Sequence, residues 1–125
     1  MLNNKEQLRI NRVEAIKAFI ENNLDDDLSL EKVSNMAAMS PYHFHRNFSK
    51  HVGKSLGAYV RGLRLEKAAN LLKDGCAEIK EVAYEAKYSE VASFHRAFTS
   101  KFGCAPGVYR EKFGWSQSSI ETINR

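Results

Sequence analysis

The sequence predicts an all-α protein in which a two-helix unit occurs twice. Apolar residues recur at spacings of three and four along most of the chain, which is the periodicity of an amphipathic helix. No neighbouring segments show the alternating pattern that a pair of strands needs. The pentapeptide FHRNF at 44–48 returns as FHRAF at 94–98, and a repeat at such a distance indicates one structural unit used twice.

The first two helices are expected on either side of an acidic run at 25–27. Before the run, apolar residues keep a helical spacing from Val13 to Leu24. After it, Ser29 has the position of an N-cap, and Glu31 suits the first turn of a short helix that follows.

A tight turn at Met39 then leads into the helix that carries the first pentapeptide. Ser40 is its expected N-cap, and Pro41 stands at the first position, where a missing N–H costs nothing. Gly53 ends this helix, and a longer helix is expected over 56–73.

The second copy repeats the first after Gly75. Its short helix carries Ile79, Val82 and Ala86 at the spacing of the first copy, and its second helix carries the second pentapeptide. Pro106 is expected to open a last short helix that ends near Phe113. The organisation predicted is an N-terminal arm, a first unit, a linker helix, a second unit, and a polar tail or truncated linker, at 1–9, 10–54, 55–75, 76–113 and 114–125 respectively.

The two pentapeptide helices have the surface expected of DNA-recognition helices. At about 100° per residue, the phenylalanines form one stripe and the opposite side carries no carboxylate. Arginine pairs with the guanine edge in the major groove, whereas acids are repelled by phosphates. The sequence therefore predicts recognition helices near 41–52 and 91–102. Their polar sides hold Tyr42, His43, Arg46, Ser49 and Lys50 in the first copy, and Ala92, Ser93, Arg96, Thr99 and Ser100 in the second.

The length of the linker helix supports the same interpretation. About 18 residues at 1.5 Å each span about 27 Å, whereas recognition helices in successive major grooves lie about 34 Å apart. With a turn at each end, one chain is expected to bind its site as a monomer.

Composition and motifs argue against several other classes. The net charge of +4 and the pI of about 9.1 favour a polyanionic partner. Cys76 and Cys104 form no C-x-x-C pair, and no apolar run reaches membrane-spanning length, so a cytoplasmic protein without a membrane partner is expected. No zinc pattern, Gly-rich phosphate loop or nucleophile elbow is present, so neither a catalytic residue, a metal nor a cofactor is expected. The alternative is a helical protein-interaction module without specific DNA binding.

Two stretches resemble the DNA-binding domain of the AraC family of bacterial transcription regulators. They are SPYHFHRNFSKHVGKSLGAYVRGLRLEKAANLL at 40–72 and IKEVAYEAKYSEVASFHRAFTSKFGCAPGVYR at 79–110. The resemblance covers roughly residues 10–111. In detail, the sequence is most similar in look to family members that carry a C-terminal gyrase-inhibitor-like effector domain. The resemblance implies seven helices, with two helix-turn-helix units on opposite ends of a linker helix, and both double-stranded DNA and RNA polymerase as partners.

The resemblance also implies site residues. Base-reading positions fall on Tyr42, His45 and Arg46 in the first unit and on Ala92, Ser93, His95 and Arg96 in the second. His43 joins this set from its place on the helical wheel. Phosphate contacts are expected from Ser40, Ser49, Lys50, Ser89, Thr99 and Ser100.

One departure from the family concerns the turn before each recognition helix. Family members commonly have Gly there, whereas this chain has Ala38 and Lys87. If Lys87 takes a left-handed conformation, it is expected to cost on the order of 1 kcal/mol relative to Gly.

Overall fold

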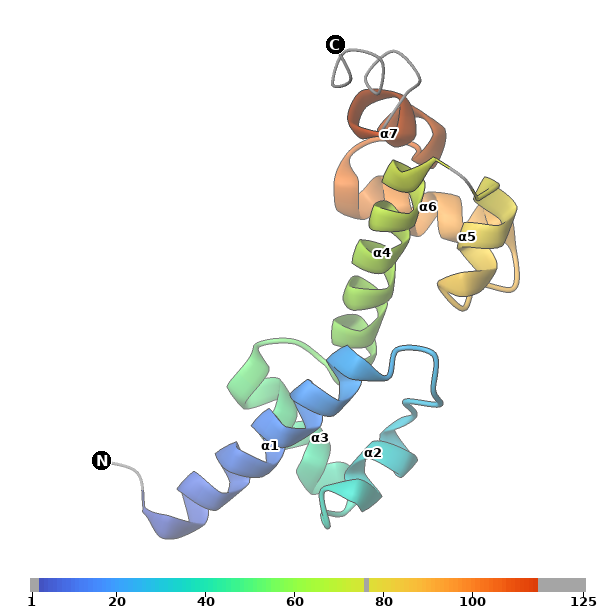
Figure 1. The fold of residues 1–125 in the computed structure, drawn as a ribbon. Coiled ribbons are helices and arrows are strands. Elements are labelled where there is room, and N and C mark those ends of the chain that lie inside the picture. The colour runs from blue at the N-terminus through green and yellow to red at the C-terminus, as the bar shows by residue number, and fades with distance from the viewer. Residues whose placement is uncertain (1–2, 76, 115–125) are drawn as a thin grey trace. The chain divides into compact units, whose positions relative to one another are not determined.

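The computed structural model describes residues 3–75 and 77–114, and these residues form helices without a strand (Figure 1). The helices are α1 (Asn4–Asn22), α2 (Leu30–Met36), α3 (Pro41–Val52), α4 (Leu56–Asp74), α5 (Ile79–Glu85), α6 (Val91–Phe102) and α7 (Pro106–Phe113). The predicted all-α fold with seven helices is therefore confirmed. Helix α1 begins inside the segment expected as an N-terminal arm. Cys76 and most of the expected polar tail, 115–125, lie outside the described residues.

The chain divides within α4 into two compact units, Met1–Leu63 and Arg64–Arg125, which we call unit 1 and unit 2. Each unit contains one helix-turn-helix and has its own hydrophobic core. Since each core is closed within its unit, the surface of each recognition helix can be described separately.

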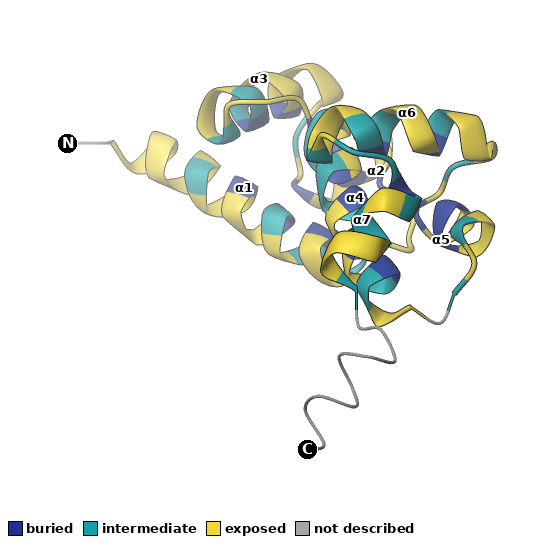
Figure 2. Cartoon of the chain, turned by 90° about the horizontal axis from the view of Figure 1, so that it is seen from above, coloured by how far each residue is buried: buried dark blue, intermediate teal, exposed yellow. Residues whose placement is uncertain are grey.

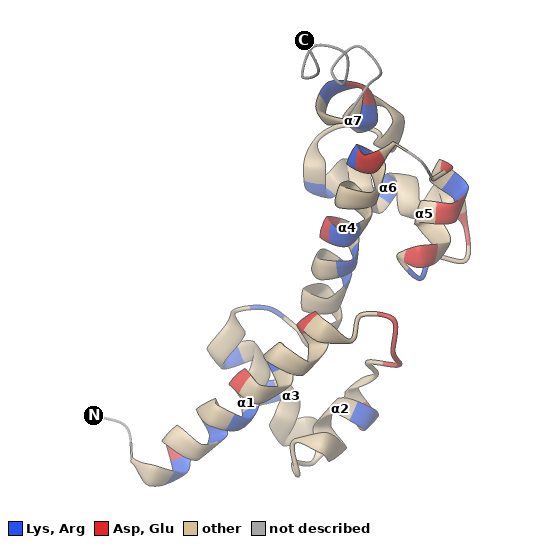
Figure 3. Cartoon of the chain, viewed as in Figure 1, with Lys and Arg blue, Asp and Glu red and all other residues tan. Residues whose placement is uncertain are grey.

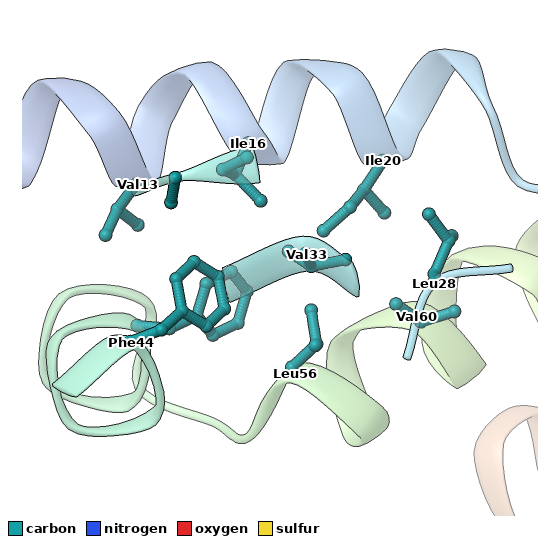
Figure 4. Packing of buried hydrophobic residues seen from close by; sticks show 10 residues of the cluster. Val13, Ile16, Ile20, Leu28, Val33, Phe44, Leu56 and Val60 are labelled. Atoms are coloured by element: carbon teal, nitrogen blue, oxygen red, sulfur yellow. The ribbon is translucent and has the colours of Figure 1, made fainter. Parts of the chain in front are cut away.

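The core of unit 1 lies between α1, α2, α3 and the start of α4 (Figure 4). Figure 4 shows Val13, Ile16 and Ile20 along one side of α1, facing Val33 and Phe44. Phe44 and Phe48 are both fully buried, and their rings stack with centroids 5.5 Å apart. This aromatic pair holds one side of α3 against the core and leaves the opposite side in solvent.

The core of unit 2 repeats this arrangement with Phe94 and Phe98, both fully buried on α6. Tyr109 of α7 meets Phe98 edge-on, with ring centroids 5.3 Å apart. The guanidinium of Arg110 donates to the carbonyl oxygens of Leu72, at 3.0 Å, and of Ala77. The Leu72 carbonyl also accepts from the Gly75 amide at 3.1 Å, so Arg110 adds a second donor at the C-terminal end of α4.

Both helix-turn-helix turns have the same backbone path. Ala38 and Lys87 adopt left-handed conformations with φ of 56° and 70°. The amides of the following residues, Met39 and Tyr88, donate to the carbonyls of Ser34 and Ala83, each at 3.0 Å. This is the bonding pattern of a Schellman motif, whose left-handed position is usually Gly. The conditional expectation of left-handed backbone at Lys87 is therefore met.

The described helices do not combine the length and apolar character needed to cross a membrane.

Candidate nucleic-acid interface

The polar side of α3 is fixed by the caps at its ends and by the phenylalanine pair beneath it. The Ser40 side chain accepts from the His43 amide at 3.2 Å, and Gly53 closes the helix in the left-handed conformation. In Figure 2 the buried positions of α3 lie on one side and exposed positions on the other. The exposed side carries Tyr42, His43, His45, Arg46 and Lys50, with Ser49 half-buried beside them.

Arg46 lies at the centre of this side and is supported by Tyr42, one turn earlier. Its Nη1 lies 3.5 Å from the Tyr42 hydroxyl, and its guanidinium carbon lies 5.8 Å from the centre of the tyrosine ring. Both side chains remain exposed. The contact therefore restricts the arginine while leaving its donors open to an acceptor outside the protein, as a guanine-reading arginine requires.

Helix α6 presents a similar side built from smaller residues. Arg96 Nη2 lies 3.4 Å from the Ser93 hydroxyl, which replaces the tyrosine of α3 as the neighbour of the arginine. Ala92, His95 and Ser100 are exposed, and Ser93 and Thr99 are half-buried. The Thr99 hydroxyl donates to the His95 carbonyl at 2.7 Å, so its proton is already used within the helix.

The two recognition helices differ at their N-termini. In α3 the Ser40 hydroxyl also lies 2.8 Å from His43 Nδ1, which orients the imidazole. In α6 the residue at the N-cap is Glu90, and its side chain makes no capping hydrogen bond. Ser89, the counterpart of Ser40 in the repeat, is exposed one position earlier. First-turn amides of α6 therefore lack a side-chain cap and remain open to an external acceptor.

Charge distinguishes α3 and α6 from the rest of the surface. Neither Pro41–Val52 nor Val91–Phe102 contains a carboxylate, although acidic residues occur on the other helices (Figure 3). A phosphate can therefore approach either helix without meeting an acid that the helix itself contributes.

The expected site residues are all accessible, and those of one helix share one side or its flank. Within the described residues, no cluster of three or more His, Cys, Asp or Glu side chains could hold a metal ion.

Two features near α3 were not predicted from the sequence. His51 Nε2 donates to Glu14 Oε1 of α1 at 2.5 Å, although 37 positions separate the two residues. A cavity between α1 and α3 includes Arg9 and Lys50 in its lining. The sequence contained one indication of the cavity, because the spacing of Lys5, Arg9 and Arg12 places three basic residues along one side of α1.

Comparison with known proteins shows that this chain is similar to helix-turn-helix proteins. A family model described as a helix-turn-helix domain matches residues 33–112. The transcriptional regulator Rob of Salmonella typhimurium is 34% identical over 102 residues, which are 82% of this chain and 35% of that protein. This chain thus spans about a third of Rob. The multiple antibiotic resistance protein MarA of the same organism is 35% identical over 98 residues, 78% of this chain and 77% of MarA.

Solved structures show the same likeness. The C-terminal domain of AraT, a response regulator from Geobacillus stearothermophilus, has a TM-score of 0.77 and 29% identity, and the match covers 85% of this chain and 88% of that one. A probable AraC family transcriptional regulator from Rhodopseudomonas palustris has a TM-score of 0.76 and 25% identity, with coverage of 84% and 99%.

Proposed function

The chain belongs to the AraC family of helix-turn-helix transcription regulators, and on that premise we propose that it binds double-stranded DNA sequence-specifically to regulate transcription. The observation that carries the proposal is the polar side of α3 and α6. Each helix places an exposed arginine opposite a fully buried phenylalanine pair, and neither helix contains a carboxylate. Such a surface fits the major groove, where arginine finds the guanine edge between phosphates.

Each proposed base-reading residue matches the chemistry of its position. Arg46 and Arg96 donate to guanine, and Ala92 offers a methyl group for thymine. Tyr42, His43, His45, Ser93 and His95 supply the neighbouring hydrogen-bonding groups.

The proposed phosphate contacts surround the base-reading residues. Ser40 and Ser89 lie before the two helices, and Ser49, Lys50, Thr99 and Ser100 lie farther along them. For Thr99 to donate to a phosphate, its hydroxyl must first leave the His95 carbonyl. These contacts position the helices and carry no sequence information themselves.

Two recognition helices in one chain allow it to read two adjacent major grooves as a monomer. Dimeric helix-turn-helix proteins need two subunits for half-sites one helical turn apart.

We propose RNA polymerase as a further partner, because a transcription regulator acts on transcription at the promoter. A cytoplasmic location follows from the proposed DNA partner in a bacterial cell.

The family contains both short and long relatives. The match to this chain covers 77% of MarA, a short relative, and 35% of Rob, a long one. The sequence resemblance to members with a gyrase-inhibitor-like domain supports a C-terminal effector domain beyond the DNA-binding part. Sequencing the reading frame past Arg125 tests this point, since a stop codon there excludes such a domain.

The function is tested by selecting duplexes from a randomised library with the purified chain at near-physiological salt. We expect two conserved boxes about 10 base pairs apart, one for each unit. A single box would reject the role of one unit, and retention without enrichment would reject sequence-specific binding. A helical protein-interaction module would show no salt-dependent affinity for duplex DNA, whereas the proposed regulator loses affinity steeply as salt rises.

A further inference from the structure

The N-terminal half of α1 extends beyond the core that α1 helps to build. Its buried residues begin at Val13; of the described residues before it, Ile10 is half-buried and the others are exposed. Figure 1 and Figure 2 both show this part of α1 projecting from the rest of unit 1. Lys5, Arg9 and Arg12 stand on one stripe of the projecting turns, at spacings of four and three. Burial does not explain why this part of the helix carries a basic stripe.

The projecting turns form a cavity of about 310 Å³ with the recognition helix. Glu6, Arg9 and Ile10 of α1 line one wall, and Asn47, Lys50 and His51 of α3 line the other. Lys50 lies on the polar side of α3 with Arg46. The cavity therefore adjoins the surface that we propose to face DNA.

The cations of this cavity are not neutralised by the protein. Among the described residues, neither Arg9 nor Lys50 forms a hydrogen bond or an ion pair through its side chain, even though Glu6 lines the same cavity. The Glu14 carboxylate instead bonds His51 at 2.5 Å and lies 3.6 Å from Lys17. The cavity thus holds two unpaired cations and one carboxylate, and its histidine is already bound.

We propose that the projecting turns of α1 form a phosphate-binding arm, in which Arg9 and Lys50 hold one backbone phosphate of the duplex that α3 reads. The inference rests on the proposed DNA-binding function. A phosphate ester offers oxygens to both cations, whereas the Asn47 amide nitrogen in the same lining already donates to the His43 carbonyl at 2.8 Å. The arm adds affinity without sequence information, since a phosphate is the same at every base pair.

The test compares Arg9→Gln with wild type on a duplex that carries both selected boxes. Loss of one phosphate contact makes the slope of log K against log salt less negative by about 0.9, which, for equal affinities at about 1 M salt, corresponds to about an eightfold weaker affinity at about 0.1 M. The matched control is Lys112→Gln, which removes one exposed charge from α7, outside both recognition helices. We expect Lys112→Gln to keep the wild-type slope. Circular dichroism checks that each variant folds.

Two further measurements distinguish a phosphate contact from a general charge effect. Phosphate ethylation should interfere with wild-type binding at one position in or beside the box read by unit 1, and Arg9→Gln should lose interference there only. Glu6→Gln, which removes the carboxylate from the cavity, should bind more tightly than wild type.

The arm is disproved if the folded Arg9→Gln variant keeps the wild-type slope and ethylation pattern while both boxes are still selected. Failure of wild type to select any site would disprove the proposed function instead. The two failures are therefore distinguishable.

Discussion

Replacing Lys87 by Gly should stabilise unit 2, because Lys87 occupies the left-handed position of its turn with φ of 70°. A left-handed conformation costs a residue with a Cβ about 1–2 kcal/mol. Gly has more conformational entropy in the unfolded chain, which reduces the gain in stability by about 0.4–1 kcal/mol. Gly keeps the 2.9 Å hydrogen bond that the backbone N–H at position 87 donates to the Tyr84 carbonyl. No side-chain contact offsets the gain, since within the described residues the exposed Lys87 forms no side-chain hydrogen bond or ion pair.

The midpoints of these two ranges, about 1.5 and about 0.7 kcal/mol, leave a net gain of about 0.8 kcal/mol, which raises the unfolding temperature by about 3–6 °C for a unit of this size. Thermal unfolding followed by circular dichroism measures it. Lys80→Gly is the matched control, because Lys80 is exposed in the first turn of helix α5 with an ordinary helical backbone, and Gly should there destabilise the unit and not stabilise it. The reasoning is refuted if Lys87→Gly lowers the unfolding temperature or leaves it unchanged while Lys80→Gly behaves as expected.

Three further results are expected from unit 1. Arg46→Ala should weaken binding to the selected duplex by about 1–3 kcal/mol and relax one position of the site; unchanged affinity and preference would remove Arg46 from the base-reading set. Phe48→Ala should cost about 3–5 kcal/mol in urea unfolding, because the ring is fully buried, and a loss below 1 kcal/mol would contradict the packing described. The hydrogen bond from His51 lowers the pKa of Glu14 from its ordinary 4.5. The stabilisation of the folded protein by the ionised Glu14 is therefore complete at pH values above 4.5, and it is lost as pH falls through the lowered pKa. As pH falls from above the ordinary pKa of Glu14 to below its lowered pKa, Glu14→Gln should therefore lose less stability than wild type, and equal losses would exclude this contribution.

Helix boundaries and the sides of the recognition helices could be predicted because they depend on neighbours along the chain. Helical hydrogen bonds join residues four apart, and side chains three and four apart share a side. The spacing of Phe44 and Phe48 was therefore enough to place Arg46 on the exposed side, and Ser40 and Gly53 were enough to mark the helix ends. The left-handed turn at Lys87 was indicated instead by the resemblance to the family, whose members commonly have Gly at that position.

Contacts between distant residues could not be predicted, because they depend on how the helices pack. Nothing local to Glu14 indicates that His51 lies 2.5 Å away, or that Arg110 binds the carbonyl of Leu72. The cavity between Arg9 and Lys50 likewise exists only where α1 passes α3. The sequence by itself determined the helices and which side of each recognition helix faces solvent. Only the tertiary structure decided which charges meet, since the crossing of helices follows from the packing of whole surfaces and not from the spacing along one chain.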